Sequence, residues 1–385
     1  MDSATLGVDR PQHRYDLRPR TKRVLYFAQS SLNKFISLND KSVKALTSKY
    51  SSSLKCLNLS CGEYTLEIRE TTLMAVIKSC EKLEELKLGR CSKITGKCFR
   101  EFRNSLKKLQ LDFASDIWAG STFGYLREIA SGESHQSLTS LDLKWNINTC
   151  CVNIIRYCNQ IIPDLVQDPI ELFSNRFCNL TILKWDLPSV HHKPGNFKVL
   201  SKLTKLEELY LTGCDDYSVN DDSLTQIMSS CVNISIFEIK GIYNPFFPEP
   251  QTQELHGITE KYLTDVSLKK LPFLCRKMKS LKLSWVKSQK ITDEFLVSLA
   301  SHKNLQSVNL EQLTNITEEG VVKLITTSKN IRYLTFSECT LLTKQVIDSI
   351  INKIHSSKLN MNLTFIQNKQ TYCHPGFSVN HNFQL

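Results

Sequence analysis

The residues best suited to chemistry in this sequence are cysteines and histidines near its middle. They are Cys150, Cys151, Cys158, His191 and His192. Zinc in proteins prefers four such ligands, usually in pairs at short, recurring spacings. The separations here match none of those spacings. We therefore interpret these side chains as ordinary thiols and imidazoles and expect no bound metal.

Motifs that bind nucleotides or activate a nucleophile are missing from the sequence. It contains no GxxxxGK[ST] phosphate loop, no GxGxxG turn and no HExxH helix. Its Ser, His and Asp residues form no recognisable arrangement of a nucleophile with its base. We therefore expect a protein that is not an enzyme and that needs no cofactor.

Composition places the chain among folded, soluble proteins. Of its 385 residues, 41% are hydrophobic and 23% are charged, and no stretch approaches the ~20 apolar residues of a membrane span. The N-terminus carries acidic and arginine residues where a secretory leader would be apolar, so the 14 cysteines indicate reduced thiols rather than disulfides. We expect a cytoplasmic or nuclear protein that makes no membrane contact.

The elements that would position any binding residues come from a repeat. The pattern LxxLxL, with apolar substitutes, returns ten times, mostly at intervals of 26 to 29 residues, and a weaker eleventh strand is expected near Leu359 to Phe365. The copies begin at Leu54, Leu83, Leu106, Leu138, Leu180, Leu206, Ile234, Met278, Leu305 and Ile331.

Each repeat reads as one strand followed by one helix. Within the strand, alternate side chains point to opposite faces, so the last two apolar positions of the pattern face inward. Between strands, apolar residues recur at helical spacing, as in 72–77, 295–300 and 321–325. Stacked units of this kind predict an α/β solenoid: a right-handed horseshoe with parallel strands on the concave face and helices on the convex face.

Two further patterns repeat with the strands. Cysteine lies three residues before the first apolar position or three after the last; these residues are Cys80, Cys91, Cys214, Cys231, Cys275 and Cys339. After several strands, an apolar residue precedes a threonine suited to the N-cap of the next helix. These threonines are Thr95, Thr264, Thr292, Thr317 and Thr343.

Together these patterns resemble the cysteine-containing leucine-rich repeat of F-box/leucine-rich-repeat proteins, over roughly residues 30 to 365. The resemblance implies a scaffold that binds other proteins, and in F-box members it implies recruitment of the adaptor of a cullin-type ubiquitin ligase. No F-box is recognisable before the first strand, where 39–46 reads as the helix of a half repeat. The adaptor-binding role therefore cannot be assigned to particular residues.

We divide the chain into three parts. Residues 1–29 are predicted to be a basic tail, whose cluster at 18–23 is either a nuclear-import signal or ordinary solvated sequence. Residues 30–365 are predicted to form a solenoid of about 10–11 repeats, with insertions near 145–178 and 242–262. Residues 366–385 are predicted to be a C-terminal cap or tail that covers the last repeat.

The candidate binding surface is the set of side chains between the two inward positions of each strand, which should point out of the concave face. Both signs of charge occur there, without the continuous basic track that a nucleic acid would need. We therefore expect a protein or peptide ligand. The predicted residues are Asn58, Lys87, Gln110, Asp142, Lys184, Tyr210, Glu238, Lys282, Asn309 and Thr335.

Five aromatic residues at the rim and in the second insertion are further candidates. Trp145 and Trp285 each lie two residues beyond the last inward position of a strand, and tryptophan is enriched among residues that dominate binding energy. Tyr243, Phe246 and Phe247 lie among prolines that exclude a regular helix or strand. The alternative is that all five side chains fold back onto the repeats.

Two functions remain open from the sequence. The first is a substrate-recognition subunit, or a relative of one, in the cullin-type (SCF) ubiquitin ligase system. The second is an autonomous scaffold or regulatory binding protein with no ligase connection. In both, we expect a chain that is a monomer outside its complex.

Overall fold

The described chain builds a single sheet whose strands follow one another in sequence order. The structure is a computed structural model, and it describes residues 24–26, 39–60, 68–89, 94–113, 119–145, 169–186, 196–214, 219–241, 263–284, 290–354, 361–367 and 370–373. Within these residues the sheet has 13 strands in the order β1 to β13. Neighbours from β1 to β12 are parallel, and β13 is antiparallel to β12.

The strands are short, as a repeat of this length requires. They are β1 (Val24–Tyr26), β2 (Cys56–Leu59), β3 (Glu85–Leu88), β4 (Lys108–Phe113), β5 (Ser140–Trp145), β6 (Ile182–Asp186), β7 (Glu208–Cys214), β8 (Ile236–Gly241), β9 (Ser280–Ser284), β10 (Ser307–Glu311), β11 (Tyr333–Ser337), β12 (Asn362–Gln367) and β13 (Gln370–Cys373). The ten strands predicted from the repeat are β2 to β11, and the weaker eleventh is β12.

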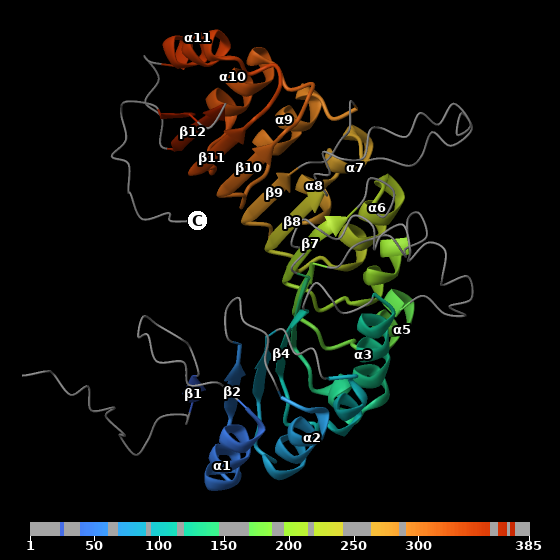
Figure 1. Cartoon of the computed structure of the whole chain (residues 1–385). Helices are drawn as coiled ribbons and strands as arrows, with labels where there is room; N and C mark the ends of the chain where they lie inside the picture. Colours follow the sequence, from blue (N-terminus) through green and yellow to red (C-terminus); the bar gives the residue numbers. More distant parts are fainter. Residues whose placement is uncertain are drawn as a thin grey trace, which may run out of the picture.

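Helices lie on the side of the sheet opposite to the concave face, so that strands line the inside of an arc and helices its outside (Figure 1). They are α1 (Asp40–Tyr50), α2 (Glu70–Ser79), η1 (Lys97–Glu101), α3 (Ala119–Ser131), η2 (Glu133–Gln136), α5 (Pro169–Arg176), η3 (Asn196–Lys202), α6 (Asp221–Ser230), α7 (Asp265–Leu268), α8 (Leu271–Leu274), α9 (Asp293–Ala300), α10 (Glu318–Thr327) and α11 (Lys344–Ile354). The predicted solenoid class is therefore confirmed.

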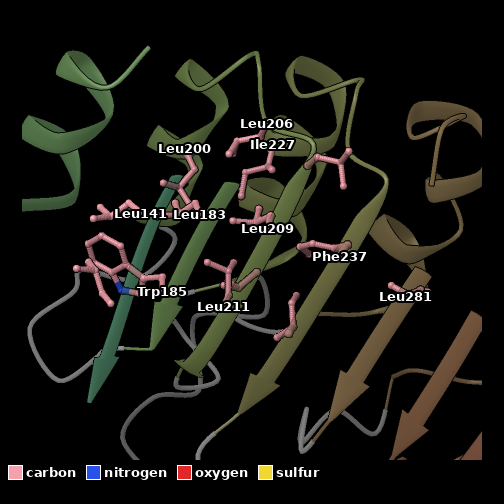
Figure 2. Packing of buried hydrophobic residues seen from close by; sticks show 14 of the residues in the cluster. Leu141, Leu183, Trp185, Leu200, Leu206, Leu209, Leu211, Ile227, Phe237 and Leu281 are labelled. Carbon is pink, nitrogen blue, oxygen red and sulfur yellow. The ribbon is translucent and has the colours of Figure 1, made fainter. Parts of the chain in front are cut away.

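Leucines that recur along the chain are brought into register and buried. The middle inward position forms one line across the sheet, in which Leu183 pairs with Leu209 and Leu209 pairs with Phe237. Leu209 is fully buried, and each such side chain contributes about 1.5–3 kcal/mol. Figure 2 shows these side chains between the sheet and the helices. The hydrophobic core is thus one continuous spine.

One inward position holds a tryptophan where its neighbours hold leucine. Trp185 of β6 is fully buried, and its ring lies 5.7 Å from that of Phe173 and 6.3 Å from that of Phe197 in edge contacts. Phe173 also stacks on Phe177 at 4.4 Å. Aromatic packing therefore fills the core beneath the centre of the array, where a larger side chain replaces the usual leucine (Figure 2).

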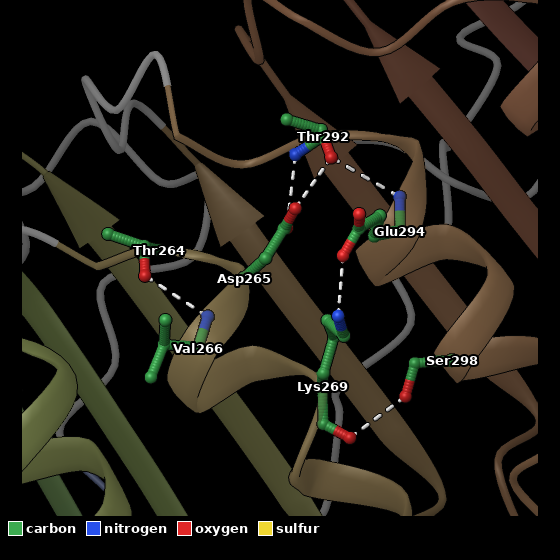
Figure 3. Close-up of polar contacts among 7 residues, drawn as sticks. All are labelled: Thr264, Asp265, Val266, Lys269, Thr292, Glu294 and Ser298. Carbon is green, nitrogen blue, oxygen red and sulfur yellow. Dashed lines mark hydrogen bonds and ion pairs between the residues drawn. The ribbon is translucent and has the colours of Figure 1, made fainter.

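A ladder of hydrogen bonds joins the start of the first helix of one repeat to the start of the first helix of the following repeat, and Figure 3 shows one such link. Asp265, the first residue of α7, accepts from the nitrogen of Thr292 at 3.0 Å and from its hydroxyl at 2.5 Å. Asp221 accepts in the same way from Thr264, and Asp293 from Thr317. Consecutive repeats are therefore locked in register outside the core as well as inside it.

The ladder alters the role predicted for the threonines. Thr264 and Thr292 are N-caps whose hydroxyls also accept from Val266 and Glu294. Thr317 occupies the N-cap position and its hydroxyl donates to Asp293, but it makes no side-chain capping bond. The prediction was wrong for Thr95, since the following glycine is the N-cap of η1.

Four cysteines of the repeat columns are buried thiols. Cys80, Cys231, Cys275 and Cys339 are free and enclosed. Burial raises the pKa of the Cys231 and Cys275 thiols to about 12, and the Cys231 sulfur donates to the carbonyl of Leu203 at 3.3 Å. These cysteines act as small apolar side chains that also satisfy a carbonyl.

Both ends of the sheet extend into segments for which the sequence predicts no strand. β1 lies within the predicted basic tail, where its three residues pair with β2. β13 lies within the predicted C-terminal cap or tail and adds an antiparallel strand beside β12. Neither segment shows apolar alternation. Each forms a strand because the edge of the neighbouring strand offers it backbone hydrogen bonds.

Candidate protein-binding surface

The ten predicted concave-face residues lie side by side in one line, here called the central row. Strand register places Lys184 beside Asp142 and Tyr210, and Glu238 beside Tyr210 and Lys282. Lys87 is exposed, and the other nine are half-buried. The row continues one strand further than predicted, to Thr364 of β12, which pairs with Thr335. Because adjacent strands lie ~4.8 Å apart, the row from β2 to β12 is about 48 Å long.

The middle of the central row is held by contacts among its own side chains. The Lys184 ammonium lies 4.7 Å above the ring of Tyr210, and the Tyr210 hydroxyl donates to Glu208 at 3.0 Å. Lys282 forms an ion pair with Glu238 at 2.9 Å. Burial and the neighbouring carboxylates raise the pKa of the Tyr210 phenol. Tyr210 therefore remains a hydrogen-bond donor and an apolar surface in the centre of the arc.

Two carboxylates near the centre differ from these paired groups. Asp142 of β5 has one oxygen enclosed without a hydrogen-bond partner, and its other oxygen lies 3.7 Å from the Lys144 ammonium. Asp186 of β6 makes no hydrogen bond or ion pair with the described residues. Burial raises the pKa of Asp186 to about 6. Within the described chain, no hydrogen-bond donor reaches the enclosed oxygen of Asp142 or the carboxylate of Asp186.

The C-terminal part of the concave face is mostly uncharged. From β10 to β12, the central row holds Asn309, Thr335 and Thr364, and the side-chain oxygen of Asn309 is enclosed without a hydrogen-bond partner. Tyr333, at the start of β11, is 52% exposed. Hydroxyls, an amide and an aromatic ring can all accept a peptide backbone without strong charge selectivity. The arc thus presents a charged centre and a neutral end.

Of the five rim and loop candidates, only Trp145 belongs to the described residues. Trp145 ends β5, and its backbone is in register with Phe113 of β4. Trp285, Tyr243, Phe246 and Phe247 lie outside the described residues, as do the cysteines and histidines of the zinc interpretation that we rejected above. Their roles remain predictions.

Charge pairing and exposure could not be read from the sequence. The two-residue alternation of each strand predicts which side chains face outward, including Asp186 and Glu208. It does not indicate that Tyr210 binds Glu208 or that Asp186 lacks a donor, since those contacts depend on rotamers. Within the described residues, no cluster of His, Cys, Asp or Glu is arranged to hold a metal ion. Nor is any helix there long and apolar enough to cross a membrane.

The fold and the surface together define a leucine-rich-repeat solenoid. A comparison with protein-family models finds no matching family, and one with curated proteins finds no matching relative. Among solved structures, a chain of the Rad7 and Elc1 complex from yeast matches with a TM-score of 0.43 and 15% identity, over 82% of this chain and 76% of that chain.

Two bacterial structures also match. An internalin, InlF, from Listeria monocytogenes has a TM-score of 0.40 and 14% identity, over 81% of this chain and 80% of its own. The leucine-rich-repeat protein LegL7 from Legionella pneumophila has a TM-score of 0.38 and 14% identity, over 88% of this chain and 91% of its own.

Proposed function

We propose that this protein is a non-catalytic recognition module that binds another protein or a peptide on its concave face. The observation that carries the proposal is the central row, which aligns partly exposed side chains of varied chemistry on one rigid sheet. A surface about 48 Å long is sufficient for the ~800 Å² per partner of an ordinary protein interface. The mixed charges of the row favour such a ligand over a nucleic acid.

A triple variant tests the proposal. Lys87→Glu, Tyr210→Ala and Lys282→Glu change three strands of the central row without touching the buried spine. The expected result is a folded protein whose principal partner, captured from native cells by the unmodified chain, no longer binds. Unchanged binding would place the partner on the loops or on the convex side.

A matched control carries the same kinds of change on the helical side. Lys44 of α1, Phe273 of α8 and Lys323 of α10 are exposed. The variant Lys44→Glu, Phe273→Ala and Lys323→Glu therefore removes two lysines and one aromatic ring away from the concave face. It should retain the partner.

We further propose that the partner belongs to the cullin-type ubiquitin ligase system, with this chain as a substrate-recognition subunit or a relative of one. Support comes from the cysteine columns and leucine repeats, which resemble those of F-box/leucine-rich-repeat proteins. An autonomous scaffold or regulatory binder is the alternative function.

Co-purification with the cullin adaptor separates the two functions. Recovery of the adaptor with the full chain, and its loss on removal of residues 1–23, would support the ligase role. This deletion leaves β1 and α1 in place, so β2 keeps its pairing with β1 and the helix that precedes it. Consistent absence of the adaptor would favour the scaffold.

A further inference from the structure

Three consecutive turns near the C-terminal end of the array carry basic side chains and no acidic one. Each turn joins the end of a helix to the start of a strand: 275–279 leads into β9, 301–306 into β10 and 328–332 into β11. All of their basic side chains are exposed, and together we call them the basic edge. They are Arg276, Lys277, Lys279, Lys303, Lys329 and Arg332.

Hydrogen bonds between the turns hold the basic edge in register. The nitrogen of Gln306 donates to the Lys279 carbonyl at 2.8 Å, and the nitrogen of Arg332 donates to the Gln306 carbonyl at 2.8 Å. The Asn304 side chain also donates to the Arg276 carbonyl at 2.7 Å. Because neighbouring strands lie ~4.8 Å apart, the edge spans about 10 Å from the first turn to the third.

The charges of the basic edge are not neutralised within the described chain. None of its six side chains forms an ion pair with a described residue. Lys277 donates to the side-chain oxygen of Asn233 at 2.8 Å, and Arg276 donates to the Phe273 carbonyl at 3.4 Å, but both acceptors are uncharged. The positive charges therefore repel one another without a compensating carboxylate.

Acidic residues of the same repeats lie at the opposite edge of the sheet. Asp293 and Glu318 begin α9 and α10, and Glu311 ends β10, whereas the basic edge follows helix ends and precedes strand starts. A basic residue after a helix interacts favourably with the helix dipole. This effect accounts for one basic residue in a turn, but the turn before β9 carries three.

The corresponding edge of the N-terminal repeats is neutralised by acids of the chain itself. Lys55, before β2, pairs at 2.5 Å with Glu84, before β3. Arg103, before β4, pairs at 3.0 Å with Glu81, also before β3. The repeat architecture therefore does not require unpaired basic turns. At the C-terminal repeats, an acidic group from another molecule would supply the charge that the described chain lacks.

We propose that the basic edge binds an acidic segment, rich in Asp or Glu, of the protein or peptide that occupies the concave face. This inference rests on the proposed function and adds a second contact to it. The two surfaces are continuous, because Tyr333 follows Arg332 directly, is exposed and begins β11 on the concave side. A chain lying on the uncharged end of the central row can therefore continue over Tyr333 onto the basic edge.

The size of the basic edge favours such a segment over a nucleic acid. Affinity for a nucleic acid comes from many phosphate contacts along a continuous basic track. Here the positive charge ends within about 10 Å, a distance that three residues of extended peptide cover. The neighbouring end of the central row is uncharged and would not extend the track.

A library of randomised twelve-residue peptides provides the probe. The labelled full chain should retain peptides enriched in clusters of Asp and Glu. The variant Lys279→Glu, Lys303→Glu and Arg332→Glu should bind those peptides at least about tenfold more weakly, because attraction becomes repulsion. The neutral variant Lys279→Gln, Lys303→Gln and Arg332→Gln should weaken binding in the same direction. Both should keep the unfolding temperature of the unmodified chain, since the three side chains are exposed.

A matched control reverses the same number of charges on the helical side. Lys44 of α1, Arg127 of α3 and Lys198 of η3 are exposed. The variant Lys44→Glu, Arg127→Glu and Lys198→Glu should bind the acidic peptides as the unmodified chain does. Equal weakening by both reversals would reduce the effect to net charge and overturn the inference.

An exchange of charge tests the contact itself. Replacing the acidic cluster of a bound peptide by lysines should abolish its binding to the unmodified chain and restore binding to the Lys279→Glu, Lys303→Glu, Arg332→Glu variant. Lysine peptides that neither protein binds would overturn the inference. So would a twelve-nucleotide single-stranded RNA that binds more tightly than the acidic peptides and is lost by the same variant, because the edge would then serve a nucleic acid.

The outcomes separate this inference from the proposed function. Peptides that bind the concave face without an acidic preference would overturn the inference and leave the recognition function intact. Acidic peptides that survive the Lys87→Glu, Tyr210→Ala, Lys282→Glu variant but are lost by reversal of the basic edge would support the edge and contradict the concave face. A chain that retains no peptide would contradict both.

Discussion

Asp265 accepts hydrogen bonds from both the main-chain nitrogen (3.0 Å) and the hydroxyl (2.5 Å) of Thr292, 27 residues later in the chain. The same pair of bonds joins Asp221 to Thr264 and Asp293 to Thr317. Each aspartate begins the first helix of one repeat and holds the residue that precedes the first helix of the following repeat. This link fixes the stagger between repeats and hence the alignment of the strands that carry the concave face.

Removing one link should destabilise the array measurably. Asp265→Ala deletes the acceptor of two charge-assisted hydrogen bonds and a favourable charge at the helix N-terminus. We expect the free energy of unfolding to fall by about 2 kcal/mol, measured by urea denaturation. Asp348→Ala, on an exposed helical surface, should change it by less than about 0.5 kcal/mol. Equal effects would show that the ladder contributes nothing.

A charge in the leucine spine should be far more damaging. Leu209 of β7 is fully buried between β6 and β8, so Leu209→Asp places a carboxylate in an apolar core. We expect a loss above about 4 kcal/mol, with hydrogen exchange accelerated first in the adjacent repeats.

An outward position provides the control for that substitution. Thr335 of β11 is half-buried on the concave face. Thr335→Asp should leave the unfolding curve nearly unchanged, since its side chain can reach water. A normal curve for Leu209→Asp would contradict the inward assignment of the repeat.

The described cysteines should differ sharply in reactivity. Burial raises the pKa of Cys231 and Cys275 to about 12 and that of Cys339 to about 11, whereas Cys178 is exposed. Because the thiolate is the nucleophile, iodoacetamide at pH 8 should label Cys178 in the native protein and spare the other three. Mass spectrometry of the individual peptides measures this. Labelling of all four should follow only in urea, and early labelling of Cys231 would refute its burial.

The sequence was sufficient to predict the arc and its outward positions. Strand period and repeat length together identify Leu209 as inward and Tyr210 as outward without any knowledge of neighbours. It could not predict the bond between Asp265 and Thr292, because those residues are distant in sequence and meet only when repeats stack. Trp185 occupies a predicted inward position, but its packing against Phe173 and Phe197 depends on how the enlarged repeat folds.

For the candidate binding surface as well, some features could be predicted from the sequence and others could not. The central row follows from alternation, so its membership was predictable. Which members pair with one another was not, since Lys184 could equally have reached Asp142 or Glu208 from its position. The sequence did not predict β13, because its four residues form a strand by pairing with the edge of β12 and not by burying an apolar pattern.

Asp186 should make stability depend on pH in a direction opposite to that of most carboxylates. Its pKa rises from 3.8 to about 6, mainly through burial, with Asp142 and Asp112 adding to the rise and Lys240 and Lys144 opposing it. Between about pH 4 and pH 6, Asp186 is therefore protonated in the folded state and ionised in the unfolded state. The penalty for ionised Asp186 is full above pH 6, shrinks as the pH falls, and is absent below about 3.8.

Asp186→Asn should accordingly stabilise the protein near neutral pH. One pKa unit corresponds to about 1.4 kcal/mol, and partial solvent access reduces the effect, so we expect a gain of about 1 to 2 kcal/mol at pH 7.5. In urea unfolding series the gain should decline from pH 6 to pH 4, whereas the exposed control Asp348→Asn should show no such decline in this range. A variant less stable than the unmodified chain at pH 7.5 would mean that a donor or a neighbouring ammonium group stabilises the carboxylate more than burial penalises it, which would contradict this prediction.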